Sequence, residues 1–255
     1  MTTASLSAVQ VSRETDGAVV LTLCRPPANA LSNSLISRLT TTLEDLAHGP
    51  NAPAVVLTGA GDRFFCAGGD LKEAVGYDAE SMAERMIAFH ALLCALEKYP
   101  RPLVCAANGW CVGGGIEMAL FSDFVYASSR ARFVFPEVAH GMLPAVKGIA
   151  RVREVLGDRG ARRLLLGGEP VDASEAKALG IVDEVVEPGE LLEAASAQAR
   201  AAAAKPPAVF AALKLALLQE TAGWPDEKQL RVTAADARTV FTDPAARAAR
   251  EAWNG

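Results

Sequence analysis

The chain has 255 residues and a net charge of -5 at pH 7; about half of its residues are apolar and 22% are charged. This length suits one large domain or a core with an appendage. The mildly acidic balance gives no reason to expect nucleic acid or an anionic membrane as a partner. The first residues lack a basic segment followed by an apolar run, so we expect no signal peptide.

The cysteines indicate the compartment. Their number is odd and no C-x-x-C pair occurs, which predicts reduced, buried thiols in a cytoplasmic protein rather than a disulfide framework. The five are Cys24, Cys66, Cys94, Cys105 and Cys111.

In chain order, short apolar runs alternate with amphipathic segments through the first two thirds of the sequence. Strands are predicted at residues 18–24, 54–58, 103–107 and 123–127. Helices are predicted at residues 34–47, at 81–98 and after the triple glycine as far as residue 119. The alternation indicates an α/β fold in which parallel strands are covered by helices.

The character of the chain changes near Pro188. Residues 191–253 contain many alanines, several helical patterns and no convincing strand. Pro206-Pro207 interrupts these patterns, and Thr242-Asp243-Pro244 is typical of a helix start. We therefore predict a core at residues 1–190 and a helical, oligomerising region at residues 191–255.

Three segments could carry chemistry. The first, Phe64–Lys72, places small residues before a charged helix start, which would let a ligand approach the backbone. The second, Ala106–Glu117, runs from a strand into three glycines and a helix, and a helix start presents unpaired N–H groups to an anion. The third, Phe133–Val138, places an acid among apolar residues. By itself the first is more often a tight turn.

The two acids in these segments have ordinary explanations as well. Glu117 lies one turn into an apolar helix, where a carboxylate is costly unless it is used or paired, although the helix dipole also favours an acid there. By itself, an acid in the position of Glu137 is more often an exposed residue at the end of an edge strand. The segments match neither a phosphate-binding P-loop nor a dinucleotide motif. No histidine or cysteine cluster has metal-ligand spacing, so no metal is expected.

Taken in order, these segments resemble the enoyl-CoA hydratase/isomerase (crotonase) family. The resemblance covers roughly residues 8–220. It is carried by Arg25–Leu31, Phe65–Lys72, Asn108–Glu117, Phe135–Glu137 with Gly141 and Pro144, and Ala173–Val186. It implies a spiral of ββα units with a helical trimerisation region, assembled as a trimer or a dimer of trimers.

The resemblance also implies site residues. The N–H groups of Gly69 and Gly114 would hold the thioester oxygen, Glu117 would activate water, and Glu137 would protonate the α-carbon. An acyl-CoA thioester would be the substrate, so that coenzyme A is part of the substrate and no separate cofactor is expected. The implied coenzyme A contacts are Ala28, Ala67, Gly69, Asp70, Leu71 and Gly114, with Arg25 and Lys72 at phosphates.

One departure from the family pattern concerns the acyl site. Ala145-Val146-Lys147-Gly148 stands where the family usually has a glycine-rich segment. A lysine close to the two acids would favour their ionised forms and oppose hydration, whereas a lysine in solvent would not disturb it. Because both acids are present, the resemblance favours an enoyl-CoA hydratase. The alternatives are a double-bond isomerase, a thioester hydrolase, a carbon–carbon lyase, or a non-catalytic acyl-CoA-binding subunit.

Overall fold

The structure is a computed structural model that describes residues 8–14, 17–48, 51–218 and 242–253. It divides into two units, residues 1–199 and residues 200–255. The predicted boundary at residue 190 falls just before helix α7 (Leu191–Ala203). The first turns of this helix belong to the first unit. There Leu191, Ala195 and Ala199 are buried.

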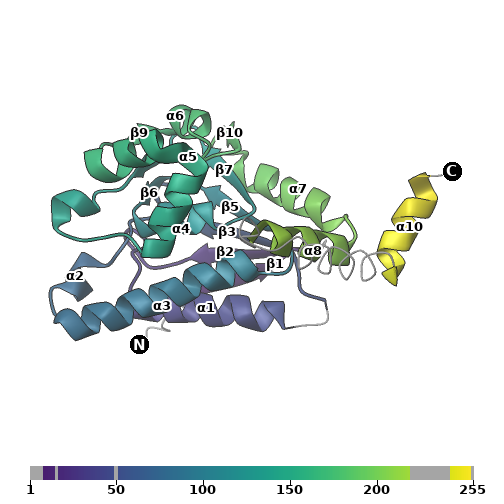
Figure 1. The fold of residues 1–255 in the computed structure, drawn as a ribbon, viewed down its shortest axis with the longest axis horizontal. Helices are drawn as coiled ribbons and strands as arrows, with labels where there is room; N and C mark the ends of the chain where they lie inside the picture. The colour runs from purple at the N-terminus through teal and green to yellow at the C-terminus, as the bar shows by residue number, and fades with distance from the viewer. Residues whose placement is uncertain (1–7, 15–16, 49–50, 219–241, 254–255) are drawn as a thin grey trace, which may run out of the picture. The chain divides into compact units, whose positions relative to one another are not determined.

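The main sheet of the first unit has six strands in the order β1-β2-β3-β5-β7-β10 (Figure 1). Strands β1 and β2 pair antiparallel, and every later pair is parallel. The strands are β1 (Val9–Arg13), β2 (Val19–Leu23), β3 (Val55–Gly59), β5 (Leu103–Ala107), β7 (Phe124–Ser128) and β10 (Glu184–Val186). All five residues of β5 are buried, as expected for a central parallel strand covered on both faces.

A second sheet positions the functional segments. Its order is β4-β6-β8-β9, with β4, β6 and β8 parallel and β9 antiparallel. These short strands are β4 (Phe64–Cys66), β6 (Trp110–Val112), β8 (Arg132–Val134) and β9 (Val171–Asp172). Since three neighbouring strands are parallel, the segments that follow them leave the sheet at the same edge.

Helices α1 (Asn33–Ala47) and α3 (Ala79–Lys98) lie side by side along the main sheet (Figure 1). Each begins at a side chain that caps the first turn: Ser32 accepts the N–H of Leu35 at 3.2 Å, and Asp78 accepts the N–H of Ser81 at 2.8 Å. The remaining elements of the first unit are α2 (Leu71–Ala74), α4 (Gly114–Leu120), the 3-10 turn η1 (Glu137–His140), α5 (Val146–Gly167), α6 (Ala173–Ala178) and most of α7 (Leu191–Ala203).

The second unit contains the last four residues of α7, then α8 (Pro207–Leu218) and α10 (Pro244–Trp253). Proline is the first residue of α8 and of α10, where its missing N–H costs nothing. Asp243 caps α10 by accepting the N–H of Ala246 at 2.8 Å. The predicted helix start at Thr242-Asp243-Pro244 is confirmed, and Pro206-Pro207 interrupts the helices between α7 and α8 as expected. Residues 219–241 lie outside the described part of the chain.

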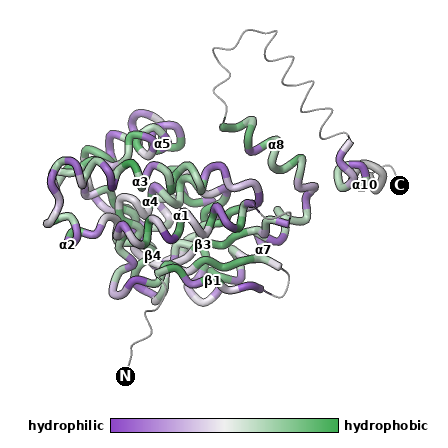
Figure 2. The backbone as a smooth tube through the Cα atoms, turned by 90° about the horizontal axis from the view of Figure 1, so that it is seen from below, coloured by the Kyte–Doolittle hydropathy of each residue, from purple (hydrophilic) through white to green (hydrophobic). Residues whose placement is uncertain are grey.

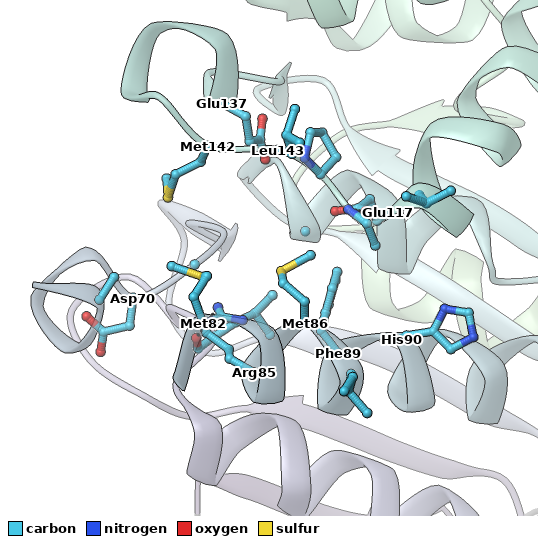
Figure 3. Close-up of a pocket in the computed structure, with 18 of the residues that line it drawn as sticks. Asp70, Met82, Arg85, Met86, Phe89, His90, Glu117, Glu137, Met142 and Leu143 are labelled. Carbon is cyan, nitrogen blue, oxygen red and sulfur yellow. Dashed lines mark hydrogen bonds between the residues drawn. The ribbon is translucent and has the colours of Figure 1, made fainter. Parts of the chain in front are cut away.

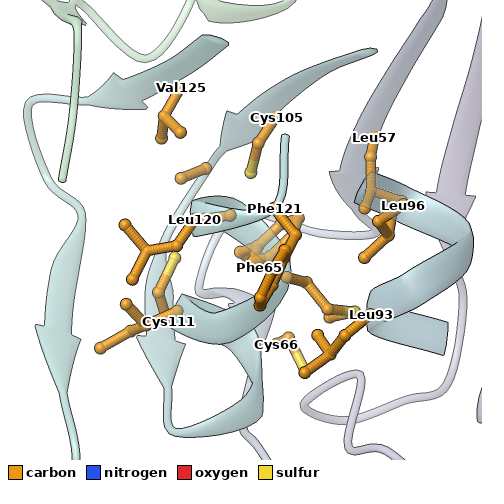
Figure 4. Close-up of a cluster of buried hydrophobic side chains, with 14 of the residues drawn as sticks. Leu57, Phe65, Cys66, Leu93, Leu96, Cys105, Cys111, Leu120, Phe121 and Val125 are labelled. Carbon is orange, nitrogen blue, oxygen red and sulfur yellow. The ribbon is translucent and has the colours of Figure 1, made fainter. Parts of the chain in front are cut away.

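The core of the first unit lies between the two sheets and the helices α1, α3 and α4. Figure 4 shows part of it, where Phe65, Leu93 and Phe121 pack with three cysteines. Cys66, Cys105 and Cys111 are buried and unpaired, as predicted, and burial raises the pKa of the Cys66 thiol to about 12. Cys24 and Cys94 are also unpaired but only half-buried, which differs from the prediction.

The predicted α/β fold is confirmed, and the boundaries of the predicted strands and helices agree with the structure within two residues where these are described. No single helix in the described ranges is long and apolar enough to cross a membrane; only α7 and α8 taken together, as a bent pair, meet that test. The cytoplasmic location stays a prediction.

Candidate functional site

The three candidate segments meet at the carboxyl edge of the second sheet. Gly69 follows β4, Gly114 and Glu117 follow β6, and Glu137 follows β8. The carboxyl ends of adjacent parallel strands meet at one edge, where ligands bind in many α/β proteins. The topology therefore brings together four residues spread over nearly seventy positions of sequence.

The N–H of Gly69 has no acceptor among the described residues, because the bridge between Gly69 and Leu31 does not use it. Leu31 and Gly69 form an isolated parallel bridge. In it the Leu31 N–H donates to the Gly68 carbonyl at 2.8 Å, and the Asp70 N–H donates to the Leu31 carbonyl at 3.2 Å. The bridge thus uses the residues on either side of Gly69, and no hydrogen bond from its own N–H is found within the described residues.

Gly114 is the first residue of α4, and the N–H groups of a first helical turn have no acceptor in the helix. The preceding Gly113 has a φ of 47° and donates its N–H to the Val134 carbonyl at 2.9 Å, which ties the start of α4 to β8. The expected free N–H of Gly114 is confirmed: it makes no hydrogen bond to any described residue. Both glycines line the same cavity.

This cavity has a volume of about 660 Å³ and mostly apolar walls. Figure 3 shows Glu117 and Glu137 on one side and residues of α3 on the other. Its lining residues are Leu31, Gly69, Asp70, Leu71, Ala74, Met82, Arg85, Met86, Ile87, Phe89, His90, Gly114, Glu117, Glu137, Gly141, Met142, Leu143, Pro144, Ala145 and Val146.

Glu117 is almost completely buried, with 1% of its surface exposed. Its Oε1 accepts the N–H of Ala145 at 3.0 Å. Burial, together with the smaller effect of the nearby Glu137 charge, raises the pKa of Glu117 to about 8. The Ala145 N–H and the Arg85 charge oppose this shift without cancelling it. The carboxyl group is therefore protonated near neutral pH.

Glu137 begins the 3-10 turn η1 and does not end a strand, so the alternative of an exposed acid at a strand end is wrong. Burial raises the pKa of Glu137 above its ordinary value. Its Oε2 is buried without a hydrogen-bond partner among the described residues. A buried carboxylate oxygen without a donor is costly, and here it faces the cavity that a ligand would occupy.

Two glycines make room for the acids. A Cβ on Gly113 would lie 2.0 Å from Oε1 of Glu137, and a Cβ on Gly148 would lie 1.8 Å from Oε1 of Glu117. Each carboxyl group thus occupies space that any other residue at these positions would fill. Gly148 is the one glycine that the chain keeps in the segment where the family usually has several.

The residues predicted to contact coenzyme A lie together. Ala67 donates its N–H to the Ala28 carbonyl at 3.0 Å, so the two predicted segments are adjacent. Asp70 caps α2 by accepting the Lys72 N–H at 3.0 Å, and the Arg25 guanidinium forms an ion pair with Asp70. Arg25 is therefore engaged within the protein, while Lys72 is exposed. Their contacts with phosphate stay predictions.

Lys147 follows neither of the two alternatives considered from the sequence. Its Nζ lies 2.5 Å from Oε2 of Glu97 on α3 and 5.1 Å from the centre of the Phe121 ring. Arg151 shares both partners, at 3.0 Å from Glu97 and 5.0 Å from the ring. The lysine charge is thus neutralised by Glu97 and forms no ion pair with either candidate acid.

From this we expect Lys147→Ala to change the hydration rate of a short enoyl-CoA by less than about tenfold, a barrier change of ~1.4 kcal/mol. The reason is that Glu97 balances the charge and Arg151 continues to hold Glu97. Steady-state kinetics with crotonyl-CoA measure the effect. A hundredfold change in either direction would show that Lys147 acts on the reaction.

The wall formed by α3 was not predicted from the sequence. Met82, Arg85, Met86 and Phe89 face the cavity at helical spacing (Figure 3), and His90 lines it as well. The signal was Arg85, which stands in the apolar stripe of α3 with Phe89, Leu92 and Leu96. A cation in such a stripe is rare unless it has a use. His140, by contrast, is exposed.

No group of three metal-binding side chains occurs within the described residues. The expectation that no metal or separate cofactor is needed stays a prediction. The chemistry available at the site is that of two protonatable carboxyl groups, two backbone donors and one buried cation.

The fold and this arrangement identify the class of protein. The profile of the enoyl-CoA hydratase/isomerase family matches residues 13–252. The chain therefore belongs to this family, as the resemblance indicated.

Individual relatives agree. The chain is 35% identical over 244 residues to the 2,3-dehydroadipyl-CoA hydratase of Escherichia coli, covering 93% of this chain and 90% of that protein. It is 35% identical over 184 residues to the short-chain-enoyl-CoA hydratase of Clostridium acetobutylicum, covering 71% and 70%. The crystal structure of enoyl-CoA hydratase from Bacillus anthracis superposes with a TM-score of 0.90 at 29% identity, covering 97% and 96%.

Proposed function

We propose that the protein is an enoyl-CoA hydratase, a lyase that adds water across the α,β double bond of an enoyl-CoA thioester. The observation that carries this proposal is the presence of two carboxyl groups, Glu117 and Glu137, in one cavity with two unpaired backbone donors. Hydration needs one group to take a proton from water and another to deliver one to carbon. The names of the two bacterial relatives support the same reaction.

The reaction can be written with this chain's own groups. The water oxygen bonds to the β-carbon, the π electrons of the double bond move between the α-carbon and the carbonyl carbon, and the thioester oxygen gains a negative charge. The ionised glutamate accepts the proton that water loses. The enolate then reforms the carbonyl while the α-carbon takes a proton from the other glutamate. The pair ends with as many protons as it had at the start.

The enolate oxygen would be held by the N–H groups of Gly69 and Gly114. Such donors cost no reorganisation when charge develops, because the backbone has already fixed them. Losing one donor of this kind typically costs about 3 kcal/mol of transition-state stabilisation. A Gly114→Pro variant is a poor test, however, since a Cβ at this position would lie 2.7 Å from Cδ1 of Leu31.

The two acids need one proton between them. The resemblance assigns water activation to Glu117, yet in the ligand-free cavity the raised pKa keeps the proton on Glu117. We propose that the proton moves to Glu137 when substrate and water enter, leaving Glu117 ionised for attack. The pair would then titrate as a coupled system with macroscopic pKa values.

The raised pKa of Glu117 predicts a pH-dependent stability. The protonated carboxyl group is favoured by folding, because its pKa rises from 4.5 to about 8. This contribution is fully present below pH ~4.5 and is lost as the pH rises through about 8. We expect Glu117→Gln to match the wild-type stability near pH 5 and to exceed it above pH ~8 by roughly 2 to 4 kcal/mol.

Urea unfolding at the two pH values measures this difference. Glu84→Gln is the matched control, because Glu84 is exposed on α3 and does not line the cavity. An equal pH dependence of stability in the wild type and in Glu117→Gln would contradict the assignment of a buried, protonated Glu117.

The proposed reaction is tested by mixing the protein with crotonyl-CoA and longer homologues. Loss of the enoyl thioester absorbance, with the mass of one water added, is the expected result. Conversion of a 3-enoyl-CoA to a 2-enoyl-CoA without added water would indicate an isomerase. Release of free coenzyme A thiol would indicate a hydrolase, and a shortened acyl group a lyase that cleaves carbon–carbon bonds. Binding without turnover would indicate a non-catalytic subunit.

We also propose that the protein is a homo-oligomer, as a trimer or a dimer of trimers. Helix α8 is apolar along much of its length (Figure 2), and it exposes Leu213, Leu215 and Leu217. Exposed apolar groups of this kind favour association with further chains. Light scattering at micromolar concentration should give three or six chains. A monomer at that concentration would contradict the proposal.

A further inference from the structure

Arg85 is a buried cation that has no anionic partner among the described residues. Only 7% of its surface is exposed, and its Nη2 donates to the Leu31 carbonyl at 2.9 Å. No carboxylate of the described residues forms an ion pair with it, and no other hydrogen bond from its guanidinium is found there. Burying a charge in this way is costly unless something compensates it.

The guanidinium lies against one of the two backbone donors. A Cβ on Gly69 would be 3.1 Å from Nη2 of Arg85. The Leu31 carbonyl that holds Arg85 also accepts the Asp70 N–H, so one carbonyl fixes both the guanidinium and the bridge that presents the Gly69 N–H. Arg85 thus lies next to Gly69, the residue whose N–H is proposed to hold the thioester oxygen.

The surroundings make this charge effective. Arg85 lines the cavity on the wall that Met82, Met86 and Phe89 make apolar, facing Glu117 and Glu137 (Figure 3). Charges interact more strongly in an apolar, water-poor environment than in solvent. Its field extends through the site, because it lowers the pKa of both Cys66 and Glu117.

We propose that Arg85 is the side-chain component of the oxyanion site, and that its guanidinium stabilises the negative charge of the enolate oxygen next to Gly69. The compensating anion, which none of the described residues provides, is then supplied by the reacting substrate. A cation placed there stabilises the enolate more than the neutral thioester, which is the difference that accelerates a reaction. The inference rests on the proposed enolate chemistry.

Acetoacetyl-CoA tests the inference without turnover. This thioester loses its acidic C2 proton to the buffer and forms a stable enolate that absorbs in the ultraviolet. Butyryl-CoA has the same number of acyl carbons and forms no enolate under these conditions. We expect Arg85→Met to weaken binding of the acetoacetyl-CoA enolate at least about tenfold more than binding of butyryl-CoA, with the bound enolate absorbance appearing at higher pH.

Two further replacements separate charge from structure. Arg85→Lys keeps a charge and Arg85→Gln keeps only a polar group, so lysine must retain more bound enolate than glutamine. Arg63→Met is the matched control, since Arg63 is an exposed arginine outside the cavity lining. It should leave the binding of both thioesters unchanged.

Several results would overturn the inference. If Arg85→Met weakened the binding of both thioesters equally, Arg85 would have only a structural role. If it changed the binding of neither, Arg85 would not be part of the site. An effect confined to an acyl-CoA with a terminal carboxylate would make Arg85 a specificity residue for acidic acyl chains instead. If the wild type binds the enolate through Arg85 but hydrates no enoyl-CoA, the proposed function fails while the inference stands.

Discussion

Glu137→Gln and Glu117→Gln should each reduce the rate of crotonyl-CoA hydration by about a thousandfold. Glutamine keeps the size of each side chain but cannot take up or release a proton at neutral pH. Positioned acid–base groups contribute roughly 10² to 10⁴-fold to a rate, and hydration uses two of them. For Glu117→Gln, the amide oxygen can still accept the Ala145 N–H, so the loss should fall on the proton chemistry.

Steady-state kinetics give the rate, and butyryl-CoA binding shows whether each variant keeps its cavity. Glu84→Gln, on the exposed face of α3, should retain wild-type turnover. If either catalytic variant kept more than about a tenth of the wild-type rate, that residue would have no essential proton-transfer role.

Gly148→Ala should lower hydration by about a hundredfold. The new Cβ would be placed 1.8 Å from Oε1 of Glu117, which is too close for two heavy atoms that are not bonded to each other. The carboxyl group must move, and it is fixed by burial and by the Ala145 N–H. Displacement of a catalytic group by about an ångström costs on the order of 10²-fold in rate.

The control lies on the same helix. Gly167 is also in α5, and a Cβ there would meet nothing within 4 Å. Gly167→Ala should therefore keep wild-type activity while making the same chemical change. Full activity in Gly148→Ala would show that Glu117 does not need its present position.

Much of the fold could be predicted because its elements depend on local patterns. The strand at residues 103–107 is a run of five apolar residues bounded by a proline and an asparagine, and the structure has it with those bounds. The helix at residues 81–98 was predicted to stop before Pro100, and it ends at Lys98 as expected. It begins two residues earlier than expected because Asp78 caps it. The short second sheet was not predicted, because three-residue strands carry too little pattern.

The residues of the candidate site could be predicted from motifs, but the contacts that these residues make with the rest of the chain could not. Glu117 and Glu137 stood out as acids among apolar residues, but nothing local showed that Gly148 lies against one of them and Gly113 against the other. Lys147 shows the same limit. Its partner Glu97 is fifty positions away on α3, so sequence alone offered only solvent or the active site as its surroundings.

The site combines main-chain donors with side-chain acids, and this affects how proteins with this fold can diversify. Two of the three groups proposed to hold the enolate oxygen, the N–H groups of Gly69 and Gly114, belong to the main chain, and of all substitutions only one to proline removes such a donor. The proposed proton-transfer groups, Glu117 and Glu137, are side chains on two separate segments, and each can be replaced by a single substitution. A lineage can therefore exchange its acids one at a time while the common intermediate remains stabilised. Few substitutions are then needed to change the type of reaction, whereas the stabilised enolate intermediate is retained.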